Sequence, residues 1–405
     1  MAATAFPMTT LLVLMSLASW PQWGGPQRNF IVADEGYDAR VDFEQIDEAW
    51  RLPLGLGQSG ICVHGDTVFT MFHQDGLEQV IAAAAEDGQL RWRRTFPLED
   101  TEGLDLEYGA GPHSTPLLVD GRLVCVGLTG RLLALDAETG RTLWQRQLWE
   151  DGAATRLERG FAASPLAVGD HVVIPVGGRD RSIRCYRLDD GRLEWQRHDY
   201  VSAYASPVLT TFGNEPQIVQ LMDQHLVGLS AATGELRWEH EVPTERYVNC
   251  TSPVVGLDGW IYINTCDGLC GLQVRRQRSG WTVREAWASP VTICQTTNFV
   301  LHDQVLYGSQ EGGVFVAVDA LTGKTLWRDR AIRDGSTLLL GELLVVLQER
   351  GELAIARASR QELRPLWRRQ VLQRYAWTPP VVDAGRLFIR DETQLIAYRL
   401  PSRSR

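Results

Sequence analysis

Lysine is almost absent from this sequence, and long basic runs are missing. Lys324 is the only lysine among 405 residues, so a mechanism that needs a lysine Schiff base has one candidate, which lies in a repeat turn. The formal net charge is −10, and no basic run exceeds a few residues. The sequence therefore has no basic patch that could bind a nucleic acid or an anionic membrane surface, and we exclude both as partners.

Apolar runs of transmembrane length are missing too, and the one apolar stretch near the start reads as an export signal. Residues 11–17 are followed by the small-x-small pattern Ser16-Leu17-Ala18, which predicts a signal peptide over residues 1–18. No Lys or Arg precedes the stretch, so an unprocessed N-terminal segment stays an alternative. Cys62 is the first cysteine, which leaves no residue for a lipid anchor near the cleavage site. We expect an exported, periplasmic or extracytoplasmic monomer that is not a lipoprotein.

The seven cysteines cannot all pair. Most stand singly within apolar runs, as Cys125 does, and are expected to be small buried hydrophobic residues. Cys266 and Cys270 flank a turn with a C-x3-C spacing, which leaves a cross-turn disulfide or half of a metal site open. Cys250 and Cys294 lie near the same repeat and are the best remaining candidates for a disulfide.

The segment from Ser114 to Trp144 shows one complete copy of a four-stranded repeat. Its first strand ends at Asp120-Gly121, a two-residue turn signal between apolar runs. A second turn, at residues 137–140, precedes the tryptophan strand. The predicted strands cover residues 115–119, 123–127, 131–136 and 141–144. This pattern predicts one antiparallel meander.

The same pattern recurs with a fixed spacing in which a turn glycine stands four residues before a tryptophan. The pairs are Gly88/Trp92, Gly140/Trp144, Gly191/Trp195, Gly234/Trp238 and Gly323/Trp327. Weaker copies end at Trp287 and Trp367, where other turns replace the glycine turn. A Ser/Thr-Pro pair often opens the first strand, a position at which proline is tolerated. Regular recurrence over the whole chain indicates a repeat architecture.

The two ends of the chain hold complementary fragments of one further copy. Residues 377–400 lack a tryptophan strand, and residues 43–51, which include Trp50, are a tryptophan strand without a meander. Joining them closes a ring and removes the last exposed edge. We therefore predict an all-β, eight-bladed β-propeller of four-stranded antiparallel blades, closed by pairing an N-terminal strand with the C-terminal blade. The predicted blades cover about 57–94, 113–147, 162–197, 204–240, 250–288, 296–328, 335–368 and 377–400, with 19–42 as an N-terminal extension and 401–405 as a tail.

The blade tryptophans are expected to be structural. An indole on each outer strand can wedge against the neighbouring blade and hydrogen-bond a backbone group there. The set is Trp50, Trp92, Trp144, Trp195, Trp238, Trp287, Trp327 and Trp367.

The phrase D-A-x-T-G-x-x-L-W at residues 136–144, repeated at residues 319–327, resembles the pyrroloquinoline-quinone-like (PQQ-like) repeat family, and the resemblance covers most of the chain. Two branches share this propeller: the quinoprotein alcohol dehydrogenases and the BamB-like outer-membrane protein assembly factor, a non-catalytic scaffold. The N-terminal motif from Trp20 to Pro26 is similar to that of exported bacterial members. A shared fold does not choose between these functions.

The dehydrogenase branch carries an adjacent cysteine pair beside the cofactor, calcium ligands and often a C-x-x-C-H haem site. This chain has neither Cys-Cys nor C-x-x-C-H. The resemblance therefore implies no cofactor, with PQQ and calcium as the alternative. The assembly-factor branch is typically a lipoprotein, whereas this chain lacks the cysteine for an anchor.

Binding in propellers usually uses the face where the connections between blades and the second-to-third-strand turns meet. The candidates for ligand or partner binding stand just before the predicted first strands. They are His113, Arg159, Phe161, Tyr204, Tyr247, Asn249, Asn298, Tyr375 and Trp377. Such a ring of residues can hold a planar cofactor or a peptide strand, or it can plug the channel, and both interpretations stay open.

The longest connection, residues 96–113, is acidic. Asp100, Glu102 and Asp105 are weak calcium candidates, because their spacing does not match an EF-hand loop, and a solvated acidic loop is the expected alternative. No Ser/His/Asp or Cys/His set can be assembled, and the histidines lack metal-ligand spacing. We predict no catalytic residue and no metal ligand.

These observations favour a non-enzymatic exported scaffold that binds a protein or peptide in the cell envelope, with a role in outer-membrane protein assembly. A PQQ-dependent oxidoreductase and a saccharide-active propeller are the alternatives.

Overall fold

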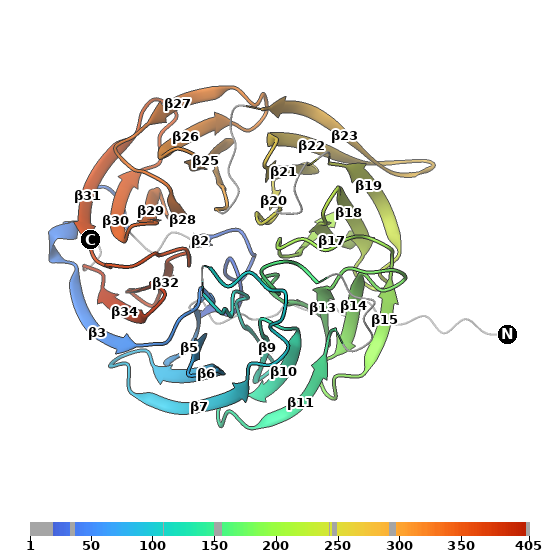
Figure 1. Cartoon of the computed structure of the whole chain (residues 1–405). Coiled ribbons are helices and arrows are strands. Elements are labelled where there is room, and N and C mark those ends of the chain that lie inside the picture. Colours follow the sequence, from blue (N-terminus) through green and yellow to red (C-terminus); the bar gives the residue numbers. More distant parts are fainter. Residues whose placement is uncertain are drawn as a thin grey trace.

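Figure 1 shows the chain as a ring of blades whose colours run in sequence order around its centre, and the sheet pairing gives eight blades. The computed structural model describes residues 19–32, 37–107, 109–149, 156–242, 244, 249–290 and 297–401. The predicted all-β, eight-bladed propeller is confirmed. Within the described ranges, no helix is long and apolar enough to cross a membrane.

The first four blades are antiparallel sheets in which each strand pairs with its neighbour in sequence. Blade 1 contains β4 (Cys62–His64), β5 (Thr67–Gln74), β6 (Leu77–Ala84) and β7 (Leu90–Pro97); blade 2 contains β8 (Leu117–Val119), β9 (Arg122–Val126), β10 (Arg131–Asp136) and β11 (Thr142–Gln147). Blade 3 contains β12 (Leu166–Val168), β13 (His171–Pro175), β14 (Ile183–Arg187) and β15 (Leu193–Arg197); blade 4 contains β16 (Val208–Phe212), β17 (Glu215–Leu221), β18 (His225–Ser230) and β19 (Leu236–Glu241).

The remaining blades follow the same plan until the last one. Blade 5 contains β20 (Val254–Val255), β21 (Trp260–Thr265), β22 (Gly268–Gln277) and β23 (Gly280–Ser289); blade 6 contains β24 (Val300–His302), β25 (Val305–Gln310), β26 (Val314–Asp319) and β27 (Thr325–Asp329). Blade 7 contains β28 (Gly335–Leu340), β29 (Leu343–Gln348), β30 (Glu352–Arg357) and β31 (Arg364–Gln370); blade 8 contains β32 (Val381–Asp383), β33 (Arg386–Arg390), β34 (Gln394–Arg399) and the N-terminal β3 (Asp47–Pro53).

The ring closes as predicted, because β3 pairs antiparallel with β34 and supplies the outer strand of blade 8. This strand begins later than the predicted residue 43. Residues Phe43–Gln45 form the 3-10 helix η1, whose first turn is capped by the Asp42 carboxylate accepting from Glu44 N. The local cap therefore competes successfully with strand pairing over the first four residues of the predicted strand.

Five of the outer-strand indoles donate to a backbone carbonyl in the turn that follows around the ring. Trp144 Nε1 donates to Leu188 O of blade 3 at 2.9 Å, and Trp92 Nε1 donates to Ala137 O of blade 2 at 3.0 Å. The turn glycine lies against the face of the same indole: a Cβ added at Gly191 would stand 2.5 Å from the Trp144 ring. Trp50, Trp287 and Trp327 likewise donate to carbonyls of the next blade. The glycine and the tryptophan of the repeat are therefore two halves of one interblade contact.

Trp238 departs from this pattern, because the short turn that would receive it is lengthened in the next blade. Blade 5 extends its outer strands into a long hairpin at that position. The Trp238 indole instead donates to Gln217 Oε1 of its own blade at 2.7 Å and covers Gly228, where a Cβ would be only 2.0 Å away.

A belt of hydrogen bonds links the inner ends of blades 2 to 6, and we call it the polar belt. Ser164 Oγ accepts from Thr115 N and Ser206 Oγ accepts from Ser164 N, both at 2.9 Å. Ser252 Oγ accepts from Ser206 N at 3.3 Å, and Asn298 Oδ1 accepts from Ser252 N at 2.8 Å. The Ser-Pro pairs of the sequence therefore join blades as well as opening strands.

The N-terminal extension crosses the centre of the ring. Its strand β1 (Ser19–Trp20) pairs with β4, and its strand β2 (Ile31–Val32) pairs in parallel with β28 on another side of the channel. Between them, the buried Arg28 guanidinium donates to Ser164 O and Pro165 O of blade 3, and Trp23 Nε1 donates to Ser252 Oγ of the polar belt. Burial lowers the pKa of Arg28 to about 9. The extension thus ties together blades that are far apart in the ring.

Ring closure also depends on Arg390, whose side chain is fully buried between blades 8 and 1. Its guanidinium donates to Gly57 O, Ser59 O and Met71 O at 2.7 to 3.1 Å. Thr70 Oγ1 at 2.8 Å and Asp391 O at 3.2 Å complete the set of acceptors. One side chain of β33 therefore satisfies several backbone carbonyls of the first blade.

The cysteines follow the hydrophobic interpretation where they are described. Cys62, Cys125 and Cys185 are buried, and Cys266 and Cys270 are free thiols. The alternative of a cross-turn disulfide between Cys266 and Cys270 is therefore not realised. Cys294, the partner considered for Cys250, lies outside the described residues.

The long hairpin of blade 5 is fastened to blade 4 by an ion cluster around Glu215. The Glu215 carboxylate accepts from Arg237 Nε, from Arg276 Nη1 at 2.9 Å and from Trp281 Nε1 at 3.1 Å. Trp281 also packs on Phe212, with ring centroids 6.1 Å apart. The hydrogen bond from Arg237 is the largest cause that lowers the pKa of Glu215.

We predict that Glu215→Gln lowers the free energy of unfolding by about 1 kcal/mol at pH 7, since the variant keeps the shape but loses the charge. A carboxyl whose pKa is lower in the folded state contributes stability above its unfolded pKa and loses it as the pH falls through the folded value. The difference between wild type and variant should therefore vanish in acid. Denaturant unfolding at pH 7 and at pH 3 measures it, and a constant difference at both pH values would contradict the assignment.

Candidate functional site

The candidate site is the face of the ring that carries the connections between blades and the second-to-third-strand turns, which we call the connection face. The extension lies toward the opposite face, because Ser19 pairs with His64 and Val32 pairs with Leu340, next to first-to-second-strand turns. Strands β1 and β2 of the extension therefore lie at the face opposite the connection face.

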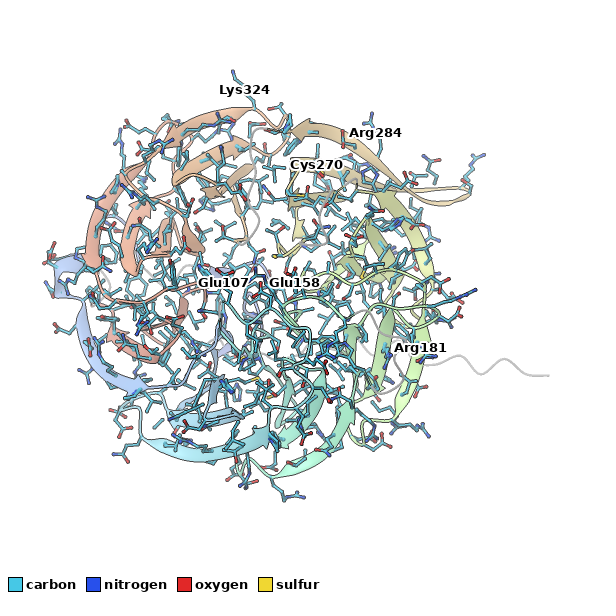
Figure 2. The ribbon with its side chains drawn as sticks, in the orientation of Figure 1. Glu107, Glu158, Arg181, Cys270, Arg284 and Lys324 are labelled. Carbon is cyan, nitrogen blue, oxygen red and sulfur yellow. The ribbon has the colours of Figure 1, made fainter. Side chains whose placement is uncertain are left out.

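Two long connections meet over blades 1 to 3 on this face. Arg159 forms an ion pair with Asp105 at 3.0 Å, and Asp105 N donates to Glu158 O at 2.8 Å. Arg159 N in turn donates to Tyr204 Oη at 3.1 Å. Figure 2 shows the exposed Glu107 and Glu158, which belong to these connections, near the centre of the ring. The structure thus brings Arg159 and Tyr204 of the predicted set together and adds Asp105 to them.

His113 and Phe161 of the predicted set belong to the interior of this region. Phe161 is buried, stacks on Trp149 with ring centroids 5.1 Å apart, and packs between blades 2 and 3. Burial, with a smaller contribution from Arg159, lowers the pKa of His113 to about 4, so its imidazole is neutral at physiological pH. Phe161 presents no surface to a partner.

Asn249 and Asn298 are buried scaffold residues. Asn249 Nδ2 donates to Met222 O at 3.0 Å, its carbonyl accepts from Tyr204 N and Ala205 N, and Asn298 ends the polar belt. Their amides are used in joining blades, which is a structural role that the sequence did not distinguish from binding. Tyr247 lies outside the described residues.

Tyr375 and Trp377 lie together on the connection between blades 7 and 8. Their rings are 5.6 Å apart, Arg350 stands 4.8 Å above the Tyr375 ring, and Trp377 Nε1 donates to Glu349 Oε1 at 3.0 Å. Trp377 also borders a pocket of about 150 Å³ that Asp334 and Glu349 line. Burial, together with the nearby Glu349 and Glu311 carboxylates, raises the pKa of Asp334.

Glu349, Arg350 and Asp334 were not among the predicted site residues. Glu349 and Arg350 form the turn between β29 and β30, and Asp334 precedes β28. The sequence could have indicated Glu349 and Arg350, because second-to-third-strand turns lie on the connection face. The prediction considered only residues that precede first strands.

The weak calcium candidates do not converge. Asp105 is paired with Arg159, and the backbone carbonyl of Asp100 accepts from Arg156. Glu102 is exposed. Across the described part of the chain, no group of three or more His, Cys, Asp or Glu side chains is arranged to hold a metal ion.

The described residues do not fit PQQ with calcium. The sequence has no adjacent cysteine pair, and the described carboxylates form no cation cage. The extension also places the hydrogen-bonded Arg28 within the ring, where it occupies space beside the first strands of blade 3. We derive no catalytic step through this group.

Comparison with known proteins separates two kinds of relative. The sequence profile of the family described as outer membrane protein assembly factor BamB matches residues 39–197, 113–328 and 310–401. The protein of that name from Burkholderia pseudomallei is 26% identical over 324 residues, which cover 76% of each chain. The quinohemoprotein alcohol dehydrogenase ADH IIB from Pseudomonas putida is 28% identical over 157 residues, which cover 36% of this chain and 21% of that enzyme.

Among solved structures, BamB from Moraxella catarrhalis superimposes with a TM-score of 0.62 at 18% identity, covering 88% of this chain and all of that one. A structural match at such low sequence identity shows a common fold. It does not show a common function.

Proposed function

Because the chain belongs to the family described as outer membrane protein assembly factor BamB, we propose that it is a non-enzymatic scaffold that binds a protein partner during outer-membrane protein assembly. In this proposal it acts in the periplasm as an exported monomer without a lipid anchor, and it uses no cofactor. The partner docks on the connection face.

The family match over residues 39–401 is the observation that carries this proposal. The arrangement of the connection face supports it. Arg159, Asp105 and Tyr204 fix two long connections over blades 1 to 3, so exposed side chains such as Glu107 and Glu158 are presented on a rigid ring. Partner binding by loops held on a rigid scaffold is a common use of such folds.

Photo-crosslinking from each face tests the proposal. With a benzophenone amino acid at position 107 or 158, we expect adducts with a subunit of the outer-membrane assembly machinery in Gram-negative envelopes. Leu257 is the matched control, since it is 87% exposed and lies in the β20–β21 turn on the opposite face. Adducts at positions 107 and 158 should be at least about tenfold more abundant than at position 257, because a rigid interface excludes the far face.

Two outcomes would contradict the proposal. Adducts formed only from position 257 would place the partner on the wrong face. Cofactor-dependent dye reduction by the purified protein with PQQ and calcium would show that it is an enzyme.

A further inference from the structure

A charged groove crosses the connection face over blades 6 and 7, away from the paired connections around Asp105 and Arg159. It consists of three adjoining depressions of about 150, 500 and 610 Å³. The depression of about 610 Å³ lies between the other two. It shares Asp334 and Glu349 with the inner depression of about 150 Å³ and Arg330 with the outer depression of about 500 Å³. The groove therefore runs from Trp377 beside the channel toward the outer rim.

Arginine dominates the outer part of this groove, which we call the arginine groove. Its guanidinium groups come from Arg328, Arg330, Arg333, Arg350 and Arg368. Arg330 donates to Gly312 O, and Arg368 donates to Ala331 O and lies 4.0 Å from Glu352 Oε1. The Arg328, Arg333 and Arg350 guanidiniums donate no hydrogen bond to a described residue. A guanidinium carries five N–H donors, so most donors of this groove are unused.

Each of the four carboxylates in the outer part of the groove accepts a hydrogen bond inside it. Asp334 accepts from Gly313 N at 3.0 and 3.1 Å, and Glu349 accepts from Trp377 Nε1. Glu352 accepts from Gln348 Nε2 at 2.5 Å, and Asp329 accepts from Ala331 N at 2.6 Å. The arginines are exposed and offer many unused donors, whereas these carboxylates are only partly exposed, so the surface of the groove suits a ligand that brings acceptors of its own.

The floor of the groove is held by backbone hydrogen bonds between separate connections. Glu349 N donates to Asp334 O, Leu372 N donates to Gly351 O, and Ala376 N donates to Glu349 O, all within 3.1 Å. The Arg350 guanidinium carbon lies 4.8 Å from the centroid of the Tyr375 ring, and a guanidinium in such a contact can still donate hydrogen bonds to a ligand. The arginine groove is therefore formed before any ligand arrives.

We propose that the arginine groove binds an extended acidic segment of the partner protein, an inference that rests on the proposed scaffold function. Carboxylates accept paired hydrogen bonds from arginine, and backbone carbonyls of an extended chain accept the remaining donors. The inner depression contains Glu311, Asp334 and Glu349 and no basic residue. The acidic residues of the segment therefore bind over the outer half, and a neutral or basic residue faces the inner end.

The test measures fluorescence anisotropy with a labelled ten-residue peptide of alternating serine and glutamate, against a counterpart with glutamine in place of glutamate. Arg333→Gln/Arg350→Gln removes two guanidiniums that donate no hydrogen bond to a described residue. Arg357→Gln/Arg364→Gln is the matched control, because these exposed arginines lie at the opposite end of β30 and β31 in the same blade and pair with Glu342 and Glu362. Thermal unfolding verifies that both double variants are folded.

We expect the glutamate peptide to bind the wild type and the control variant about tenfold more tightly than the groove variant, with affinity falling as salt rises. The glutamine peptide should bind at least about tenfold more weakly than the glutamate peptide to the wild type. Equal binding of both peptides, equal loss in both double variants, competition by inorganic phosphate at equal charge, or capture of anionic lipid vesicles in place of the peptide would each overturn the proposal. Loss of peptide binding with intact crosslinks at positions 107 and 158 would overturn the arginine groove alone and leave the scaffold function standing.

Discussion

Arg390→Ala is expected to lower the free energy of unfolding by at least about 4 kcal/mol. The substitution removes a fully buried side chain whose guanidinium donates to Gly57 O, Ser59 O, Thr70 Oγ1 and Met71 O across the last ring interface. Each acceptor left without a donor in the interior costs about 1 to 3 kcal/mol, and the vacated volume adds a cavity. Burial lowers the pKa of Arg390 to about 10, so the group is still charged at neutral pH.

Denaturant unfolding measures this effect, and Arg386→Ala is its control on the same strand. Arg386 lies at the other end of β33, is partly exposed and makes no side-chain hydrogen bond to a described residue. We expect its substitution to change stability by less than about 0.5 kcal/mol. Equal destabilisation by the two variants would mean that Arg390 does not join blade 8 to blade 1.

Gly140→Ala is expected to lower the free energy of unfolding by about 3 kcal/mol. The φ angle of Gly140 is +68°, a region that costs an L-residue about 1 to 2 kcal/mol. A Cβ there would also stand 2.6 Å from the Trp92 ring, and overpacking of this kind costs about 1 to 3 kcal/mol more. The expected loss exceeds backbone strain alone because the indole, fixed by its bond to Ala137 O, has no room to retreat.

Gly121→Ala separates the two contributions within the same blade. Its φ angle is +70°, yet an added Cβ would meet nothing within 4 Å. Thermal or denaturant unfolding should therefore show a loss of about 1 to 2 kcal/mol for this variant, which is the cost of strain alone. The interblade role of the glycine-tryptophan pair is refuted if the two alanine variants are equally stable.

The fold was predictable because its periodic features are local. A turn glycine and a tryptophan four residues later are fixed by one hairpin, so the spacing survives in five blades and can be counted without any knowledge of neighbours. Trp238 shows the limit of that reasoning. Its direction depends on the turn of the next blade, and the lengthened β22–β23 hairpin there sends the indole back to Gln217.

The candidate site was predictable only in part, because its contacts join residues that are distant in sequence. Arg159 and Tyr204 are joined by a hydrogen bond although they are 45 residues apart in the sequence, and no repeat pattern predicts that contact. Asn249 and Asn298 looked like binding residues, since exposed and buried amides are identical in a sequence, but their bonding partners place them in the scaffold. The path of the N-terminal extension could not be predicted either, because its sequence has no repeat pattern.

The pairing of β2 with β28 and of β3 with β34 sets the order in which the chain can become resistant to proteases. Residues 31–32 pair with residues 339–340, and residues 47–53 pair with residues 394–399. Strands β2 and β3 thus precede most of the chain but pair with strands near its other end, and a chain that stops before β34 keeps β3 unpaired. We therefore expect an incomplete chain to be cleaved by proteases near β3, because the strand that pairs with it is missing.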